Sequence, residues 1–373
     1  MRRVRLQDIA ERSGVSIKTV SNVVNGKASV TDSTRTRVQA VIDDLGYRPN
    51  VAAQHLRRGR SGMIALAFPE LTEPYFAELA SHLVRAAKKR GLSAIVSQTD
   101  GLAETERAVA DGTDMPLVDG LILSPLALGA ADLAERTDKG PLVLLGETVR
   151  DESPYPRVAI DNHQAAVEAT LHLAGLGRRR IAAIGARATA PRATAVLRLE
   201  GYRAGLAAAG LSYDSDLVGY VPGFHRCDGE QAMFDLLQRD PRPDAVFCFN
   251  DSLALGALRA LRESGLSVPD DVAIIGIDDI EEGRFSAPAL STIAPDKSAI
   301  ADAAISLLLD RADDPNSAPR EVTVGFELVA RGSTSCPSPA PTPLPVTTRP
   351  SNREFDDDSP DTAGLGLPKS PEA

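Results

Sequence analysis

The chain is poor in cysteine and has no long apolar run. Its three cysteines, Cys227, Cys248 and Cys336, form neither a CxxC pair nor a disulfide framework, and this usage suits a reducing compartment. No stretch approaches the roughly 20 apolar residues of a membrane span, and no apolar segment of signal-peptide type follows the charged N-terminus. We therefore expect a cytoplasmic chain without a membrane partner.

Sequence motifs for nucleotide, phosphate and metal chemistry are also missing. No GxGxxG follows the first apolar run, and no GxxxxGK[ST] phosphate loop occurs. The segment 175–180 (GLGRRR) lies between a helical pattern and a strand, which is the wrong order for dinucleotide binding. No Cys/His cluster suggests a metal site. We expect no catalytic activity, no cofactor and no bound metal.

The net charge of −10 hides a basic N-terminal region. Residues 1–60 contain twelve Lys or Arg and five Asp or Glu, so they carry +7 and the rest of the chain carries −17. A small basic domain on an acidic body is typical of a protein that docks one domain on phosphate groups. A solvated basic surface would give the same count, so charge alone leaves both interpretations open.

The N-terminal region has the pattern of three short helices. Gly14 can take the positive φ that a tight turn needs after the first helix. Ser16 can cap a second helix whose valines face inward, and a third helix is expected from about Thr31 to Gly46. Three short helices with a glycine turn between the first two predict an all-α helix-turn-helix domain.

Residues 61–334 alternate short apolar runs with helical patterns. Two series of about 120 residues predict two doubly wound parallel-sheet subdomains with helices on both faces. Ligands of open α/β sheets bind beyond the carboxyl ends of the strands, so a cleft between two sheets is the natural site. Strands are expected at 64–68, 94–97, 121–124, 142–145, 181–184, 245–249 and 272–277, and helices at 74–90, 103–113, 162–176, 195–209 and 252–264.

Three segments of the N-terminal region closely resemble the lac repressor family. They are 4–26 (VRLQDIAERSGVSIKTVSNVVNG), 34–38 (TRTRV) and 45–50 (LGYRPN). The similarity extends to about Thr334, and the core resembles the periplasmic sugar-binding-protein fold that this family uses. The resemblance implies an all-α helix-turn-helix headpiece joined to an α/β periplasmic-binding-protein-like core.

Composition and resemblance together divide the chain. The Pro/Ser/Thr-rich C-terminal tail has too little apolar surface to order itself. Within the core, the first subdomain is expected at about 61–161 plus 295–324, and the second at about 162–294 plus 325–334. The expected parts are the DNA-binding domain at 1–49, a hinge helix and linker at 50–60, the effector-binding core at 61–334, and a disordered tail at 335–373.

By this resemblance the second helix is the recognition helix of the major groove. Ile17, Lys18 and Asn22 should face base edges, where Lys18 can donate to guanine and Asn22 can pair with adenine. Most family members have arginine at the position of Asn22, so a relative's operator does not transfer to this chain. For Ile17 the alternative is simple packing. The residues expected to contact phosphate or backbone are Ser16, Thr19, Ser21 and Asn25.

Residues 50–58 resemble the family's hinge helix. Asn50 can cap this helix, but nine residues are too few for a stable isolated helix, which needs about 12–15. We expect it to fold only when paired with its twin on DNA. The resemblance makes Leu56 the apolar wedge in the minor groove and Ala53 a further DNA contact.

The effector is expected in the cleft of the core. Arg198, in the typical segment LRLEGY, would be a fork-shaped donor to hydroxyls or a carboxylate. Pro295 stands where a glutamine is common in the family. The aromatic residues Tyr75, Phe76 and Phe224 can stack on a sugar or base ring, although they could also be core residues. The other expected contacts are Asp161, Arg192, Thr194, Asn250, Asp251 and Asp278. For the three aspartates helix capping is the alternative, above all for Asp251.

These features predict a homodimeric, nucleoid-associated transcriptional repressor that reads a pseudo-palindromic operator. We expect a sugar or polyol as effector, because sugar regulators are the larger class, with a purine-type corepressor as the alternative. A solute-binding protein for transport, a Rossmann oxidoreductase or a sugar kinase fits less well, since neither a signal peptide nor a nucleotide motif is present. The sequence does not say whether the effector releases DNA or promotes binding.

Overall fold

The computed structural model describes residues 4–24, 29–47, 60–113, 117–146, 154–188 and 193–335. Most of the predicted hinge and tail, together with Cys336, therefore lie outside the described residues. The same holds for five predicted contact residues: Asn25, Asn50, Ala53, Leu56 and Arg192.

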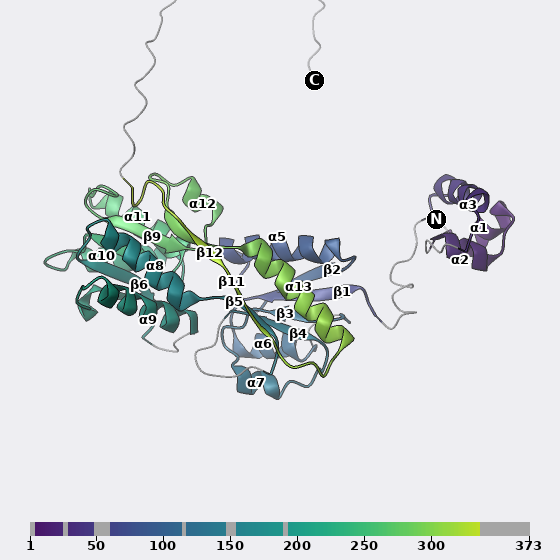
Figure 1. Cartoon of the computed structure of the whole chain (residues 1–373), viewed down its shortest axis with the longest axis horizontal. Coiled ribbons are helices and arrows are strands. Elements are labelled where there is room, and N and C mark those ends of the chain that lie inside the picture. The colour runs from purple at the N-terminus through teal and green to yellow at the C-terminus, as the bar shows by residue number, and fades with distance from the viewer. Residues whose placement is uncertain are drawn as a thin grey trace, which may run out of the picture. The chain divides into compact units, whose positions relative to one another are not determined.

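The N-terminal domain consists of α1 (Leu6–Ser13), α2 (Ile17–Val24) and α3 (Asp32–Asp44), shown in purple in Figure 1. Gly14 ends α1 at φ +68°, and Ser16 Oγ accepts a hydrogen bond from the Thr19 amide at 3.1 Å. The predicted helix-turn-helix is confirmed. Its buried core is made of Ile9, Ala10, Val20, Val23, Val38 and Ile42.

The first of two six-stranded sheets has the order β11-β5-β4-β3-β1-β2, and all its strands are parallel. Along β1, Ile64 and Leu66 pack in the cluster that contains residues of α5 and α13, whereas Ala65 packs with residues of α6 and α7. Alternate side chains point to opposite faces of a strand, so helices cover both faces. The strands are β1 (Met63–Phe68), β2 (Ser93–Gln98), β3 (Leu121–Leu123), β4 (Leu142–Leu145), β5 (Arg157–Ile160) and β11 (Glu321–Val324). The helices are α5 (Pro74–Lys89), α6 (Ala103–Ala110), α7 (Ala130–Ala134) and α13 (Lys297–Asp313).

The second sheet has the order β12-β10-β9-β8-β6-β7, and only β12 is antiparallel to its neighbour. Helix α8 packs closely on α9 at Gly201, where a Cβ would lie 2.2 Å from the carbonyl oxygen of His163. The strands are β6 (Ile181–Ala186), β7 (Val218–Tyr220), β8 (Ala245–Cys248), β9 (Ala273–Ile277), β10 (Ser291–Pro295) and β12 (Phe326–Val329). The helices are α8 (Asn162–Gly175), α9 (Ala193–Ala208), η1 (Ser215–Leu217), α10 (Arg226–Leu237), α11 (Asp251–Glu263) and α12 (Glu281–Arg284).

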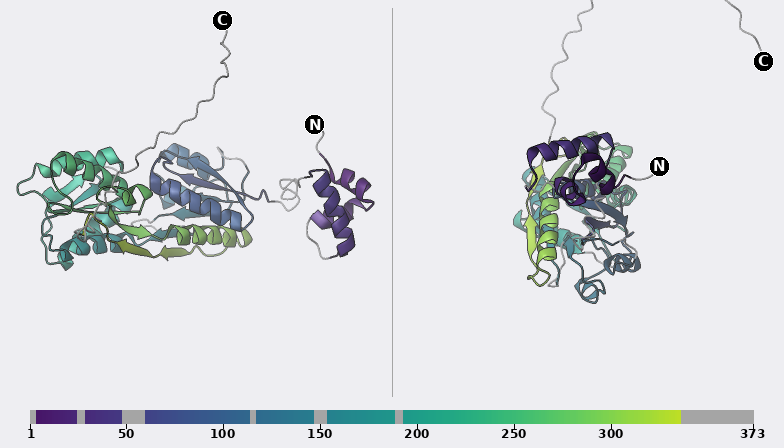
Figure 2. Two further views of the ribbon diagram at one scale, coloured as in Figure 1. Left: turned by 90° about the horizontal axis from the view of Figure 1, so that it is seen from above. Right: turned by 90° about the vertical axis from the view of Figure 1, so that its right-hand side faces the viewer.

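We call each sheet with its helices a subdomain, and Figure 2 shows the two side by side. The chain passes between them three times: from β5 to α8, from β10 to α13, and from β11 to β12 through Gly325. In Figure 1, β5, β11 and β12 lie together where the two subdomains meet. Connections of this kind, a few residues long, are where domain closure bends.

The predicted α/β architecture is confirmed, and every strand and helix expected within the described residues is present, with ends that differ by up to three residues. Ten elements among the described residues were not predicted: β5, α7, η1, β7, α10, α12, β10, α13, β11 and β12. No helix among the described residues has the length and apolarity needed to cross a membrane.

Candidate functional site

A cavity of about 690 Å³ lies where the carboxyl ends of strands from both sheets converge. Pro69, Gln98 and Ser124 line it at the ends of β1, β2 and β3 of the first sheet. Asn250 and Asp278 line it just beyond the ends of β8 and β9 of the second sheet. This is the edge at which open α/β sheets bind their ligands. Seven of the ten predicted effector contacts line the cavity: Tyr75, Phe76, Thr194, Arg198, Phe224, Asn250 and Asp278.

Asp161 does not line the cavity. Its side chain is exposed and caps α8, where it accepts a hydrogen bond from the Gln164 amide at 2.8 Å. The capping alternative is therefore observed for Asp161, and a ligand contact by this residue stays a prediction. The next residue, Asn162, does line the cavity and is buried, although the sequence did not single it out.

Asp251 is not among the lining residues either, nor is it the helix cap. Asn250 caps α11, because its side-chain oxygen accepts a hydrogen bond from the Leu253 amide at 2.9 Å. Asp251 is only 1% exposed and accepts hydrogen bonds from the Thr292 hydroxyl at 2.8 Å and the Ile280 amide at 3.0 Å. Its carboxyl group supports the loop after β9.

Arg198 joins three elements at the cavity wall. It is buried, and its Nε donates to Asn162 Oδ1 at 2.7 Å. Its Nη1 donates to the backbone carbonyl of Phe249, just after β8. The guanidinium on α9 is therefore held in one orientation between the start of α8 and the end of β8. A fixed planar donor of this kind is suited to recognise hydroxyl or carboxylate oxygens.

Asp278 places a carboxyl group of unusual pKa in the cavity. Only 6% of the residue is exposed, and burial raises its pKa from 3.8 to about 7. Arg198 and Lys297 act in the opposite direction, whereas Glu73 and Glu78 raise the pKa further. Near neutral pH this carboxyl group is present both as an acid that donates and as a carboxylate that accepts.

The aromatic residues belong partly to the cavity and partly to the core. Tyr75 and Phe76 meet edge to face, with ring centroids 5.4 Å apart. Both line the cavity, and both also pack, like Phe224, against the main hydrophobic cluster. Burial raises the pKa of the Tyr75 hydroxyl, so it stays neutral and can donate a hydrogen bond. The core alternative is therefore borne out for these rings, and their stacking on a ligand stays a prediction.

Two acidic side chains that the sequence did not single out bridge the subdomains at the cavity. Glu70 Oε2 lies 2.8 Å from His225 Nε2, and Glu73 Oε2 accepts from the Ser252 hydroxyl at 2.8 Å. The hydrogen bond to Glu70 raises the pKa of His225, and the same bond lowers the pKa of Glu70. Burial raises the pKa of Glu73. Nowhere in the described residues are three or more His, Cys, Asp or Glu placed to hold a metal ion.

Helix α2 turns polar residues outward over an apolar inner face. Ile17 is 49% exposed, so it does not pack in the domain core, and Lys18 is exposed beside it. Asn22 is partly exposed, as are Thr19 and Ser21. Together with the cap residue Ser16, these side chains remain the candidate DNA contacts among the described residues.

Comparisons with known proteins match both the N-terminal domain and a large part of the core to known families. The family described as bacterial regulatory proteins, lacI family, matches residues 5–50, and the periplasmic binding protein-like domain matches residues 170–334. The ribose operon repressor of Escherichia coli (strain K12) is 33% identical over 338 residues, which are 88% of this chain and 99% of that protein.

Two further relatives are similar over a comparable length. The HTH-type transcriptional repressor PurR of Photobacterium profundum is 30% identical over 332 residues, 88% of this chain and 98% of the relative. The solved complex of the transcriptional regulator CelR with cellobiose is 31% identical with a TM-score of 0.66, and the match covers 89% of this chain and all of that one. With its helix-turn-helix and its paired α/β sheets, the chain belongs to the lacI family of bacterial regulatory proteins, whose members are DNA-binding transcriptional repressors with a ligand-binding domain.

Proposed function

We propose that the operator affinity of this repressor is set by a neutral sugar or polyol bound in the cavity between the subdomains. The observation that carries this proposal is the cavity itself, which combines aromatic rings with a small set of oriented polar groups. Two of the similar proteins are named for sugars, the ribose operon repressor and the CelR–cellobiose complex. Effector binding would shift the subdomains relative to one another and so change the stability of the hinge helix on DNA.

The charges around the cavity favour a neutral ligand over an anion. Of the lining residues described by the structure, Glu70, Glu73, Asp100 and Asp278 are carboxylic acids, whereas Arg157, Arg198 and the His225 that pairs with Glu70 are the basic groups. An anionic effector would be repelled by most of these groups, whereas a hydroxyl-rich ligand can both donate to carboxylates and accept from arginine. A purine remains the second candidate, because PurR is a relative and Tyr75 and Phe224 offer ring faces.

A thermal-shift screen of the full chain tests the sugar proposal. The probes are D-ribose, cellobiose, xylitol and adenine, because a ligand that binds only the folded state raises the melting temperature by mass action. We expect at least one sugar or polyol to raise it by several degrees. Stabilisation by adenine alone would favour the purine candidate, and no stabilisation by any of the four would count against the proposal.

Replacing Asn22 by alanine is expected to weaken operator binding by about 1–3 kcal/mol, because one bidentate base contact is lost. Specificity should relax at a single base pair rather than across the site. The measurement is fluorescence anisotropy on a duplex selected by the wild-type chain from randomised pseudo-palindromes. Gln39→Ala, which changes an exposed side chain on α3, is the control and should leave affinity unchanged. A uniform loss on all duplexes would show that Asn22 does not read a base.

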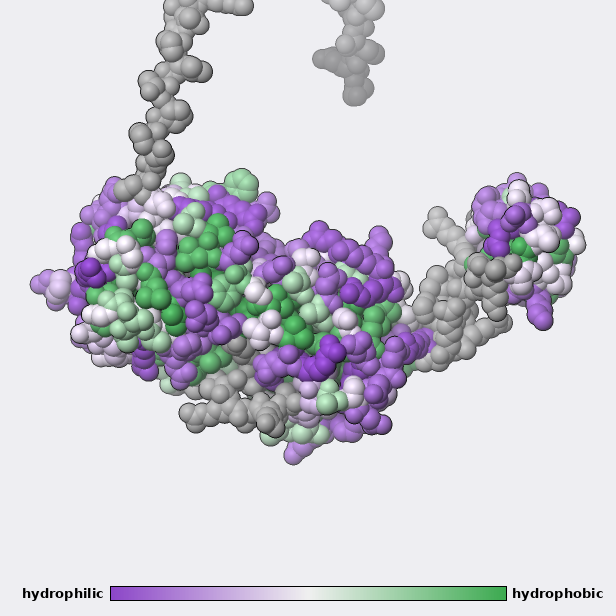
Figure 3. Space-filling view, in the orientation of Figure 1, coloured by the Kyte–Doolittle hydropathy of each residue, from purple (hydrophilic) through white to green (hydrophobic). Residues whose placement is uncertain are grey.

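We further propose a homodimer that binds both half-sites and is associated with the nucleoid. In the first subdomain, Val84 on α5, Val96 on edge strand β2 and Leu102 after it are exposed, which supports a subunit interface there. Figure 3 shows apolar side chains among hydrophilic ones on one face of both subdomains. Asn50, Ala53 and Leu56 remain proposed hinge contacts with the minor groove.

Effector affinity is expected to fall as the pH rises from 6 to 9. The Glu70–His225 bridge joins the two subdomains at the cavity, and both partners are charged at pH values between the lowered pKa of Glu70 and the raised pKa of His225. As the pH rises past the pKa of His225, the imidazole loses its charge and the ion pair is lost. The side chains are 36% and 45% exposed, so the bridge should contribute no more than about 1 kcal/mol, a factor of about five in affinity.

Titration calorimetry of the wild type and of His225→Gln, with the most stabilising probe, checks this pH dependence. Asp278 and Glu73 also titrate at the cavity, and Asp228 lies 3.2 Å from His225 Nδ1, but all three remain in the variant. The difference between the two proteins therefore reports the charge of His225, which acts on Glu70 through the bridge and also on the pKa of Glu73. The same pH dependence in both would contradict a role for His225.

A further inference from the structure

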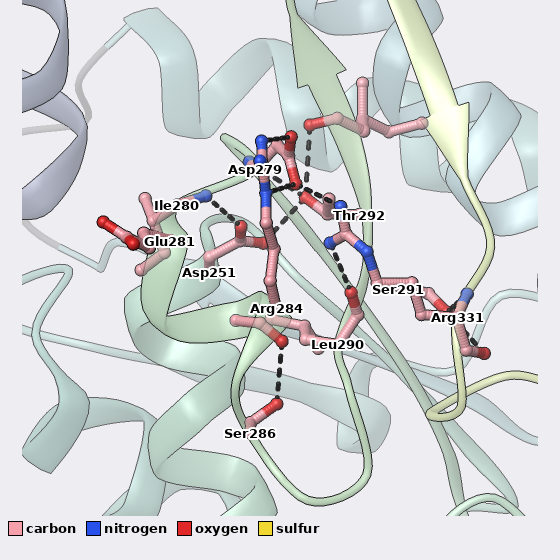
Figure 4. A network of polar contacts seen from close by, with 12 residues as sticks. Asp251, Asp279, Ile280, Glu281, Arg284, Ser286, Leu290, Ser291, Thr292 and Arg331 are labelled. Carbon is pink, nitrogen blue, oxygen red and sulfur yellow. Dashed lines mark hydrogen bonds and ion pairs between the residues drawn. The ribbon is translucent and has the colours of Figure 1, made fainter.

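A partly buried ion-pair network surrounds the loop that follows β9. The carboxylate of Asp279 accepts from Arg284 Nη2 and from Arg331 Nη2, each at 2.5 Å, and Figure 4 shows the two arginines reaching it from different segments of the chain. The side chains of Asp279 and Arg331 are 13% and 18% exposed, whereas that of Arg284 is 54% exposed. Burial acts to raise the pKa of Asp279, but the bonds from Arg284 and Arg331 bring it below its usual value. Arg331 is therefore the better shielded partner of a charged carboxylate.

The loop has a backbone conformation that needs support. Asp278 has φ +119° and Asp279 has φ +49°, in the region that L side chains rarely adopt. Such residues persist only where the surrounding structure holds them. The Asp278 amide donates to the Ile293 carbonyl at 2.9 Å, and the Ile280 amide donates to Asp251 at 3.0 Å. Between these two bonds, the Asp279 amide donates to the Thr292 hydroxyl at 3.3 Å, and the ion pairs hold the Asp279 side chain.

Arg331 connects this loop to the segment before β10. It follows β12, its Nη1 donates to the Leu290 carbonyl at 2.8 Å, and its backbone amide donates to Ser291 Oγ at 2.7 Å. Arg331 itself is not among the residues that line the cavity, whereas Asp278 is. The guanidinium therefore reaches the cavity only through Asp279.

The outer side of the loop contacts the first subdomain. Lys297 Nζ donates to the Asp279 carbonyl at 3.1 Å and also pairs with Glu78 of α5. Glu78 accepts in addition from the Glu281 amide at 3.0 Å. One short loop therefore presents Asp278 to the cavity and touches the other subdomain through the Asp279 carbonyl and the Glu281 amide.

We propose that Arg331 is a positioning residue for effector binding: through Asp279 it holds Asp278 in the conformation that presents its carboxyl group to the cavity. This inference rests on the proposed function, because it takes this cavity as the effector site. Without the guanidinium, Asp279 keeps only the exposed Arg284 as an ion-pair partner. The strained loop then relaxes, and both the ligand contact and the contact with Glu78 are weakened.

Hydrogen exchange of the full chain, read by mass spectrometry, tests the positioning role without a ligand. In Arg331→Gln we expect exchange in residues 278–283 to rise at least tenfold while β9 and β10 keep their protection. Arg331→Lys, which keeps the charge but not the planar fork, should give a smaller rise. Arg259→Gln is the matched control, because it removes an exposed arginine that pairs with Glu263 in the same subdomain. Unchanged exchange in the loop, or an equal rise throughout β9 and β10, would overturn the proposal.

Calorimetry with D-ribose and cellobiose tests the consequence for binding. For a probe that binds the wild type, we expect Arg331→Gln to lower affinity at least tenfold and Arg259→Gln to leave it unchanged. Wild-type affinity in Arg331→Gln would overturn the positioning role. If neither probe binds the wild type, that result counts against the proposed sugar effector, and the exchange experiment alone decides the role of Arg331.

Discussion

Replacing Asp278 by asparagine is expected to stabilise the ligand-free protein at pH 8 while weakening effector binding. The native pKa of about 7 lies above the unfolded value near 3.8, so folding is most favoured while the carboxyl group is protonated. That stability is present below pH 4 and is lost as the pH rises towards 7. A shift of about three pKa units corresponds to roughly 4 kcal/mol, because each unit is about 1.4 kcal/mol. Asparagine has no charge to bury, and it tolerates the positive φ as well as aspartate does.

Urea unfolding of the core at pH 4 and pH 8 measures this gain. The free energy of unfolding should be nearly equal in wild type and Asp278→Asn at pH 4, and several kcal/mol higher in the variant at pH 8. Asp302→Asn is the control, and it should lower the free energy of unfolding at pH 8 rather than raise it. The ion pair with Arg90 lowers the pKa of Asp302, and the variant loses this pair in its native state. If the difference in the free energy of unfolding between wild type and Asp278→Asn does not change with pH, burial does not disfavour the charged form of this carboxyl group.

Arg198→Lys is expected to abolish the effector response although it keeps the positive charge. A lysine cannot reach Asn162 Oδ1 and the Phe249 carbonyl at once, so the donor that faces the cavity is no longer fixed. We expect a loss of about 3 kcal/mol, which lowers effector affinity by at least about 100-fold. Operator binding without effector should remain close to that of the wild type, because Arg198 belongs to the core and not to the helix-turn-helix.

The matched control for this prediction is Arg203→Lys on the same helix, where an exposed arginine donates to the Tyr213 hydroxyl at 3.0 Å. It should bind effector like the wild type. The measurements are calorimetry with the most stabilising probe and anisotropy on the selected operator. A normal effector response in Arg198→Lys would show that the ligand does not use this wall of the cavity.

Local patterns in the sequence predicted most of the fold. Gly14 and Ser16 mark the turn and cap of the helix-turn-helix, and both take the expected geometry. The long helix α13 was not predicted, because Ile300, Leu307 and residues between them are buried on more than one face and leave no simple amphipathic pattern. Strands β5, β7, β11 and β12 have only three or four residues, too few for a clear periodicity.

The candidate site was predicted less completely, for reasons of geometry. Asp278 follows a strand end that faces the cavity, where the topology alone places ligand groups, whereas Arg198 lies within α9 and was expected from the family resemblance. Asp161 occupies a similar position in the sequence, but capping turns its side chain away. The bridge between Glu70 and His225 joins residues 155 positions apart, and no local pattern reveals such a pair.

Control of DNA binding by the cavity ligand is tested most directly by the operator affinity of the full chain with and without the most stabilising probe. We expect the ligand to change this affinity at least about fivefold in one direction, since coupling free energies between sites are typically about 1–3 kcal/mol. The change should disappear in Arg198→Lys. A ligand that stabilises the wild type, fails to stabilise Arg198→Lys, and still leaves operator affinity unchanged would contradict control of DNA binding by this cavity.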